Sequence, residues 1–201
     1  MARQKEFDRQ LVLEKAMETF WQYGYEGTSV QTLLKAMGLN RGSMYDTFGD
    51  KRSLFLEAIT HYEKGVMQGA IAKLEAPGAG KAEIINHFQS LLDRVESERA
   101  QWGCFVTNVA VELCSHDVEA SDCIKKSLQR VEQAFGHALT NAQQQGEIPA
   151  SADVNALATF LTCTMQGLRV MAKVDPCPQR LNNMITSALS VLDKDHSGEL
   201  H

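Results

Sequence analysis

The sequence predicts an all-α protein of about nine helices, and three observations support this. Apolar residues recur at the three- and four-residue spacing of a helix along nearly the whole chain, for example at Leu13, Ala16, Met17 and Phe20. No stretch longer than a few residues shows the strict polar–apolar alternation of a half-buried strand. Glycine and proline stand between the periodic segments, where helices are expected to end.

The first apolar stripe is expected to stop near Gly24. Thr28 then has a hydroxyl that suits the N-cap of a short second helix, and Gln31 stands three residues later in the capping-box position. Gly38 is expected to end this helix, because glycine readily adopts the left-handed conformation of a C-cap.

Two more helices are expected to follow directly. Asn40 suits the N-cap of a third helix, Arg41–Phe48, and Asp50 suits that of a fourth, Lys51–Lys73. In the third helix, Met44 and Phe48 are expected to face the core. The stretch Ala-Pro-Gly-Ala-Gly at 76–80 then makes the clearest linker-like break in the chain.

Five helices are expected beyond this break. They are Lys81–Glu98, a segment starting near Trp102, Glu119–Gln145, a helix capped by Asp153, and a last helix after Pro176-Cys177-Pro178. The last two helices form an amphipathic pair, which is expected to build a four-helix bundle with a symmetry mate in a homodimer.

Composition limits the class of protein. The 201 residues are 44% hydrophobic and 22% charged, as in ordinary globular proteins. No apolar run approaches the ~20 residues of a membrane span, and the N-terminus lacks a signal-peptide core, so we expect a cytoplasmic protein without membrane contact. The net charge of −5 argues at first against nucleic acid. However, residues 1–53 carry eight basic and seven acidic residues, and the remainder carries twelve and eighteen, so the acidic excess lies in the second part.

The five cysteines are irregularly spaced and form no C-x-x-C pair, so we expect reduced thiols, no structural metal and no cofactor. Cys114, His116 and Cys123 remain an alternative set of three metal ligands, although their spacing is unusual.

The segment 28–48 is the most informative about function. Two helices this short are too small to be stable alone and must pack on their neighbours. Two short helices joined by a tight turn with glycine form a helix-turn-helix, whose second helix can enter the major groove of DNA.

The run from Thr28 to Phe55, TSVQTLLKAMGLNRGSMYDTFGDKRSLF, resembles the DNA-binding signature of TetR-family repressors, and Ala16, Phe20, Gly24 and Tyr25 match the first helix of that family. The resemblance covers about residues 5–60. It implies a DNA-binding domain at 1–60 and a ligand-binding and dimerisation domain at 61–195.

Free amides and hydroxyls at the start of the second helix suit phosphate oxygens, and the third helix offers polar side chains to the bases. The residues expected at double-stranded operator DNA are Thr28, Ser29, Gln31, Asn40, Arg41, Gly42, Ser43, Tyr45, Asp46, Thr47 and Lys51. Asp46 departs from the family pattern, because its carboxylate repels phosphates; it is expected to face a cytosine amino group or to point away from the DNA.

The second domain is expected to hold a small-molecule inducer in a cavity. The candidate residues are Trp102, Cys104, Phe105, Asn108, Phe135, Phe160, Met165 and Gln166; at helical spacing, each is also compatible with plain core packing. Cys104 stands two residues after the aromatic residue that opens a helix. A helix N-terminus lowers the pKa of a thiol, so Cys104 is either a sensor of electrophiles or oxidants, as its similarity to Gly-Cys elements of the family implies, or a buried packing residue.

We therefore expect a sequence-specific repressor that a small molecule or reactive electrophile releases from its operator. An enzyme is not expected, because no nucleophile–base group or phosphate-binding glycine loop is present at motif spacing. A helix-turn-helix module that binds proteins without DNA remains the alternative, and activation in place of repression is also open.

Overall fold

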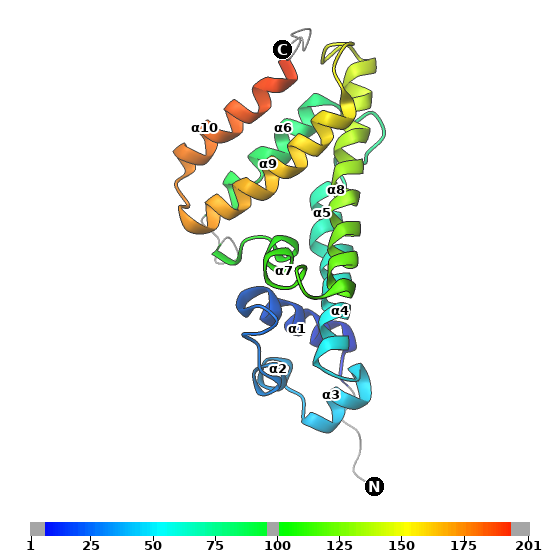
Figure 1. Ribbon diagram of the computed structural model, residues 1–201, viewed down its shortest axis with the longest axis vertical. Coiled ribbons are helices and arrows are strands. Elements are labelled where there is room, and N and C mark those ends of the chain that lie inside the picture. Colours follow the sequence, from blue (N-terminus) through cyan, green and yellow to red (C-terminus); the bar gives the residue numbers. More distant parts are fainter. Residues whose placement is uncertain (1–6, 96–100, 194–201) are drawn as a thin grey trace.

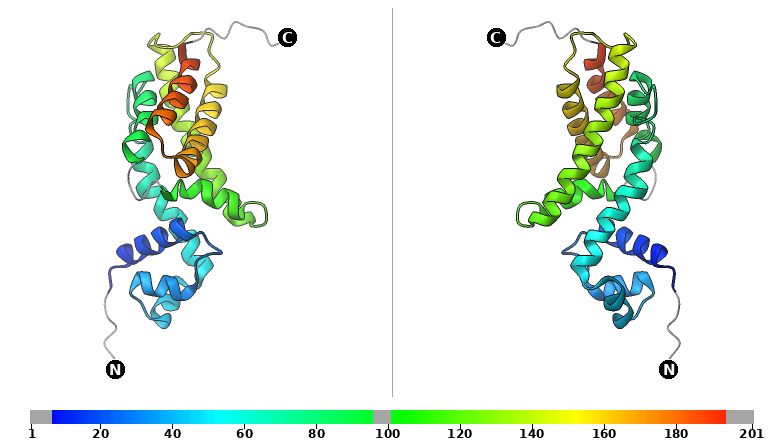
Figure 2. Two further views of the ribbon diagram at one scale, coloured as in Figure 1. Left: turned by 90° about the vertical axis from the view of Figure 1, so that its left-hand side faces the viewer. Right: turned by 90° about the vertical axis from the view of Figure 1, so that its right-hand side faces the viewer.

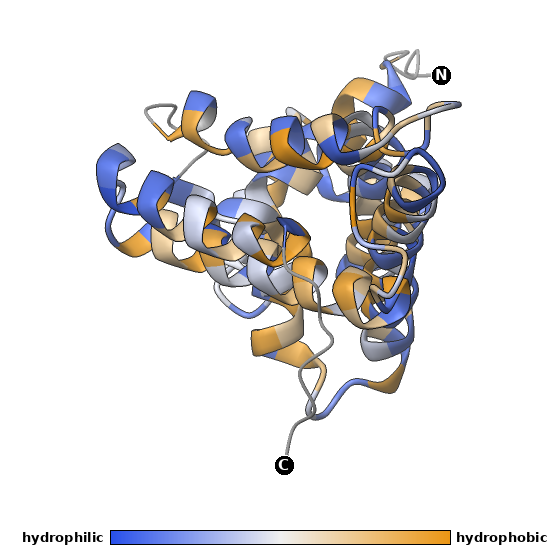
Figure 3. Ribbon diagram, turned by 90° about the horizontal axis from the view of Figure 1, so that it is seen from above, coloured by the Kyte–Doolittle hydropathy of each residue, from blue (hydrophilic) through white to orange (hydrophobic). Residues whose placement is uncertain are grey.

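The computed structural model describes residues 7–95 and 101–193, and every regular element in these ranges is helical. The prediction of an all-α fold is confirmed. Figure 1 shows a small N-terminal head below a body of longer helices, and the helices carry apolar and polar segments in turn, as amphipathic helices do (Figure 3). No helix in the described ranges is long and apolar enough to cross a membrane.

The head consists of α1 (Arg9–Tyr23), α2 (Val30–Met37), α3 (Arg41–Phe48) and the first turns of α4 (Lys51–Tyr62). Its core forms around Phe20 of α1 and Phe55 of α4, whose rings meet edge to face with centroids 5.0 Å apart. Both rings are fully buried, so the short α2 and α3 fold against a rigid pair of helices.

The fourth predicted helix is not regular. After Tyr62 the rod continues through a π-helical turn, Glu63–Met67, into the single α-helical turn α5 (Gln68–Ile71). Counting this rod as one helix, the described chain has nine helices, as predicted. The wider turn begins at Glu63, which accepts a hydrogen bond from the hydroxyl of Ser127. π-turns inside α-helices often mark functional positions.

The body consists of α6 (Lys81–Gln89), α7 (Phe105–Leu113), α8 (Val118–Gln144), α9 (Val154–Val174) and α10 (Pro178–Leu189), with short 3-10 turns at Leu92–Arg94 and Ser190–Asp193. The side views in Figure 2 show α8 running along the height of the body, and α9 packs between α8 and α10 (Figure 1).

Two predicted helix boundaries in the body are wrong. The helix expected over Lys81–Glu98 ends at Gln89 and gives way to the 3-10 turn, and residues 96–98 lie outside the described ranges. The segment expected to start near Trp102 becomes helical only at Phe105, because Gly103 adopts a positive φ of 71° that interrupts the chain just before it.

Most predicted caps are confirmed, and one is wrong. Asn40, Asp50 and Asp153 each accept a hydrogen bond from a backbone amide in the first turn of the helix that they cap. The cap of α2 is Ser29, which accepts from the amide of Thr32 at 3.0 Å, and not Thr28. Thr28 is one residue too early: it is buried and donates its hydroxyl proton to the carbonyl of Gly24.

Polar contacts fasten the head to the body. Arg52 of α4 forms a bidentate ion pair with Asp117, the N-cap of α8, and reaches Glu119 at 3.0 Å. Glu112 of α7 accepts hydrogen bonds from two backbone amides of the loop after α1, at 2.8 and 3.0 Å. The loop after α1 and the start of α4 are therefore bonded directly to α7 and to the start of α8.

Candidate DNA-binding surface and ligand cavity

The helix-turn-helix is built by local signals. Gly38 ends α2 with φ of 67° and ψ of 28°, the left-handed conformation predicted for it, and Asn40 starts α3 by accepting from the amide of Ser43 at 2.9 Å. Met44 and Phe48 of α3 are buried, as predicted, against the rest of the head. Because these two side chains fix the inner face of α3, its other face is turned to solvent.

The residues predicted to contact DNA lie mostly on this outer surface. Exposed are Ser29, Gln31, Asn40, Arg41, Gly42, Tyr45 and Asp46, and partly exposed are Ser43, Thr47 and Lys51. Thr28 does not fit its predicted role, because its side chain is fully buried and hydrogen-bonded inward. Ser29 takes its place at the N-terminus of α2, next to the free backbone amides.

Lys51 stands beside this surface at the start of α4. Its ammonium group lies 4.1 Å from the ring centroid of Tyr25, a cation–π contact that holds the lysine at the edge of the head. Arg41 and Asp46 of α3 make no ion pair with any residue in the described ranges and are free to meet a partner.

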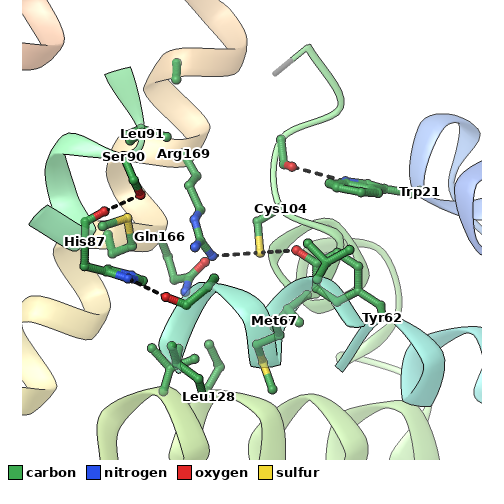
Figure 4. Close-up of a pocket in the computed structure, with 18 of the residues that line it drawn as sticks. Trp21, Tyr62, Met67, His87, Ser90, Leu91, Cys104, Leu128, Gln166 and Arg169 are labelled. Atoms are coloured by element: carbon green, nitrogen blue, oxygen red, sulfur yellow. Dashed lines mark hydrogen bonds between the residues drawn. The ribbon is translucent and has the colours of Figure 1, made fainter. Parts of the chain in front are cut away.

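The body contains a cavity of about 350 Å³, at the small end of the range for small-molecule sites. Figure 4 shows side chains from α1, the α4–α5 rod, α6, α8 and α9, and from the segment before α7, converging on it. The wall is largely apolar, and the part of the chain that the structure describes contributes no aspartate or glutamate to it. It consists of Trp21, Tyr62, Val66, Met67, Ala70, Ile71, His87, Ser90, Leu91, Val95, Gly103, Cys104, Val106, Leu128, Val131, Met165, Gln166, Arg169 and Ala172.

A polar cluster lies at one side of the cavity. The guanidinium of Arg169 donates to Sγ of Cys104 at 3.4 Å, and the hydroxyl of Tyr62 lies 3.9 Å from the same sulfur (Figure 4). Nearby, the hydroxyl of Thr107 donates to Oε1 of Gln166 at 2.8 Å.

The cluster shifts the ionisation of its members. Burial alone raises the pKa of the Cys104 thiol, but the charge of Arg169 and hydrogen bonds from Thr107 and Tyr62 outweigh it, so the pKa lies below that of an ordinary thiol. Burial and the neighbouring Cys104 raise the pKa of Tyr62 far above its ordinary range, so its hydroxyl stays protonated. Cys104 is also the N-cap residue of α7, where the helix dipole favours a thiolate.

Three of the eight predicted ligand residues line the cavity: Cys104, Met165 and Gln166. The other five lie elsewhere. Phe105 and Phe135 are core residues, Phe160 is 42% exposed on the outer face of α9, and Trp102 packs edge to face on Trp21. Asn108 donates to the carbonyl of Trp102 at 2.8 Å and so supports the turn before α7. Helical spacing indicates which faces are apolar but not which of them surround a void.

Sequence reasoning missed the charged and aromatic residues of the wall, Trp21, Tyr62, His87 and Arg169. For Arg169 a signal was present. It lies between Met165 and Ala172 on the buried stripe of α9, where a charged residue is rare without a function. Nδ1 of His87 lies 3.0 Å from the carbonyl oxygen of Ala70, to which it donates when it carries the proton.

An exposed helix-turn-helix head on a helical body with a cavity defines a class, the ligand-regulated DNA-binding proteins. Comparison with known proteins gives the family: residues 12–58 match the bacterial regulatory proteins of the tetR family, and residues 80–188 match the tetracyclin repressor-like C-terminal domain. The chain belongs to the TetR family of helix-turn-helix transcriptional regulators.

Relatives agree over nearly the full chain. The uncharacterised regulator YezE of Bacillus subtilis is 40% identical, covering 96% of this chain and all of YezE. The transcriptional repressor ComR of Escherichia coli is 30% identical, covering 93% of this chain and 90% of ComR. Among solved structures, the regulator CifR in complex with a 26-base-pair operator is 28% identical with a TM-score of 0.83, covering 94% of this chain and 98% of that one.

Proposed function

We propose that this protein is a transcriptional repressor that binds its operator as a homodimer through α2 and α3, and leaves it when a small molecule enters the cavity or reacts with Cys104. It acts by binding and not by catalysis. The observation that carries the proposal is that a residue of the DNA-binding head also lines the cavity in the body. Trp21 belongs to α1 of the head and also lines the cavity, and its indole N–H donates to the carbonyl of Gly103 at 3.1 Å.

The rod from α4 to α5 provides a second connection. Lys51, at its start, lies at the predicted DNA surface, and Tyr62, Met67 and Ile71 further along line the cavity. A homodimer must hold its two recognition helices about 34–36 Å apart to meet successive major grooves. An occupant that moves this rod changes that spacing and lowers operator affinity, to the extent that it binds the displaced state more tightly.

The DNA surface is tested with the double variant R41A/K51A. Both positive side chains face the predicted DNA surface, so we expect the variant to lose most of its operator affinity and to show a shallower dependence of affinity on salt. Lys125 is exposed on α8, which belongs to the body and not to the helix-turn-helix, so K125A serves as the control. Fluorescence anisotropy with the promoter of a neighbouring gene measures both.

The same measurement tests the alternative, a helix-turn-helix that binds only proteins. Operator affinity equal to that of the unchanged protein in R41A/K51A contradicts the DNA surface. Altered preference at a single base pair after substitution of Asn40 or Arg41 supports direct reading of DNA by α3.

The thiol of Cys104 is tested separately. N-ethylmaleimide is expected to release the unchanged protein from its operator, because the lowered thiol pKa and the cavity wall position favour reaction at Cys104. In this reaction Sγ forms a bond to an alkene carbon, the adjacent carbon takes up a proton, and nothing leaves. C104S is expected to stay bound, whereas C177S, which removes an exposed thiol, is expected to be released. Equal release of C104S contradicts the thiol role.

A further inference from the structure

Arg169 is a partly buried cation that forms no ion pair with an aspartate or glutamate of the described residues. It lies on the inward face of α9, and the only hydrogen-bond acceptor that its guanidinium contacts in the described ranges is Sγ of Cys104. A guanidinium has five N–H donors, so most of its donors remain open to the cavity. No aspartate or glutamate of the described residues lines that cavity.

This arrangement is costly for the protein alone. Partial withdrawal of a charge from water is unfavourable unless the charge is paired and hydrogen-bonded. A protonated Cys104 thiol carries no charge to balance that of Arg169. A thiolate balances the charge but accepts from only one side of the planar guanidinium, so the other N–H groups lack an acceptor there. An anionic ligand in the cavity supplies the missing charge.

The rest of the cavity wall indicates the chemical character of the part of the ligand that does not contact Arg169. Aliphatic and thioether side chains of the α4–α5 rod, of α8 and of the segment after α6 make up much of the wall, and Figure 4 shows Met67 and Leu128 below Arg169 and Leu91 beside it. They include Met67, Leu91, Leu128 and Val131. Gln166, whose carbonyl oxygen already accepts a hydrogen bond from Thr107, also lines the cavity and carries an amide N–H group that can donate to an anion.

We propose that the cavity binds small organic carboxylates, with the carboxylate on the guanidinium of Arg169 and the amide of Gln166 and an apolar body against the wall of Met67, Leu91, Leu128 and Val131. The inference rests on the cavity being the effector site of the proposed repressor. It names a ligand class that binds reversibly, whether or not Cys104 is reactive.

The test compares acids with their neutral amides of the same shape. Phenylacetate is compared with phenylacetamide, and hexanoate with hexanamide, by isothermal titration of the full-length C104S protein in the absence of DNA. Because a hydrogen bond to a charged partner in a buried site is strong, we expect at least one acid to bind roughly tenfold tighter than its amide. Amides that bind as tightly as the acids, or the absence of binding by both acids, overturn the proposal.

Two variants locate the anion. In R169Q the preference for the acid is expected to fall to within about twofold, and in R169K, which keeps the charge but loses the planar fork, part of it is expected to remain. An unchanged preference in R169Q overturns the proposal. Thermal unfolding identifies a variant that does not fold, and the acid–amide comparison in C104S alone then decides.

Alkylation of Cys104 in the unchanged protein gives an independent readout. The thiolate sulfur displaces iodide from iodoacetate or iodoacetamide, so that an S–C bond forms, the C–I bond breaks, and iodide leaves with the electron pair. Arg169 is expected to hold the carboxylate of iodoacetate, so its rate relative to iodoacetamide exceeds the same ratio for free glutathione about tenfold or more. A ratio equal to or below that of glutathione overturns the proposal.

These measurements contain no operator, so their outcome is separate from the proposed function. Repression without release by any ligand contradicts the inducer mechanism, while the preference for acids stands or falls on the binding data alone.

Discussion

Asp117 joins the two parts of the molecule at the scale of a single residue. Its carboxylate caps α8 by accepting from the amide of Ala120 at 2.9 Å, and it also holds both guanidinium nitrogens of Arg52 in the head. The hydrogen bonds from Arg52 and then from the backbone amide lower its pKa to about 2. The fold therefore favours the ionised form, which the ion pair with Arg52 requires.

Substitution at Asp117 separates these contacts. D117A removes the cap and the ion pair, and we expect it to lower the free energy of unfolding by about 1–2 kcal/mol. D117N keeps a capping oxygen and loses only the charge, so about half of this loss is expected. Chemical denaturation measures both. A D117N that is as unstable as D117A contradicts the importance of the cap.

The lowered pKa also predicts a pH dependence. The pKa of Asp117 falls from an ordinary 3.8 in the unfolded chain to about 2 in the fold. Its contribution is therefore complete above pH 4 and is lost as the pH falls from about 4 to about 2. The stability difference between the unchanged protein and D117N is expected to shrink over this range in acid titrations followed by circular dichroism. A difference that stays constant down to pH 2 contradicts the assignment.

Residues of the DNA surface were easier to predict than residues of the cavity. Asn40 and Arg41 are placed by a local cap and by the period of one short helix, which the sequence contains in full. Phe160, predicted to line the cavity, is exposed, and Arg169, not predicted, lies inside it. Both stand on α9, and the facing of that helix depends on α8 and α10, which the sequence does not position.

At the scale of elements, the turn between α2 and α3 is the most precisely specified. Gly38 has a positive φ, and a Cβ added to it would meet nothing within 4 Å, so its conformation and not its surroundings requires glycine. We expect G38A to lower the free energy of unfolding by about 1–2 kcal/mol. G38N is the matched control and is expected to lose less, because asparagine tolerates the left-handed region. Equal losses, measured by denaturation, contradict this explanation.

The π-turn Glu63–Met67 could not be predicted from the local sequence pattern. The apolar period through Ile59, Tyr62 and Ile71 indicates one continuous helix, and the structure agrees except for this turn. The extra residue in the turn rotates the side chains around it, so that Val66 and Met67 both line the cavity. The hydrogen bond from Ser127 of α8 to Glu63 comes from 64 residues away, and no local pattern contains it.

At the scale of the whole molecule, α9 carries an exposed stripe at alternating four- and three-residue spacing. It consists of Ala156, Phe160, Cys163, Gly167, Val170 and Val174. Such spacing is typical of a helix that packs on another helix. This agrees with the prediction of a dimer through the last two helices, and Gly167 at the centre of the stripe permits a close approach.

We therefore expect F160D and V170D to shift the protein from dimer to monomer, because each places a charge in the dimer contact. Operator affinity is expected to fall with the dimer, since one head meets only one half-site. V111D, which changes an equally apolar residue that is 83% exposed on α7, is expected to remain dimeric. Light scattering after size-exclusion chromatography measures the mass, and dimeric V170D and F160D contradict this interface.

The position of Trp21 couples ligand binding in the cavity to operator binding by the head. Its indole belongs to α1 of the head and also lines the cavity, where its N–H donates to the carbonyl of Gly103. Coupling between two sites is reciprocal: a ligand that weakens operator binding by some factor is itself bound more weakly, by that same factor, on operator-held protein. DNA thus acts as an antagonist of the effector. On the proposed function, a stronger operator therefore requires more effector for induction.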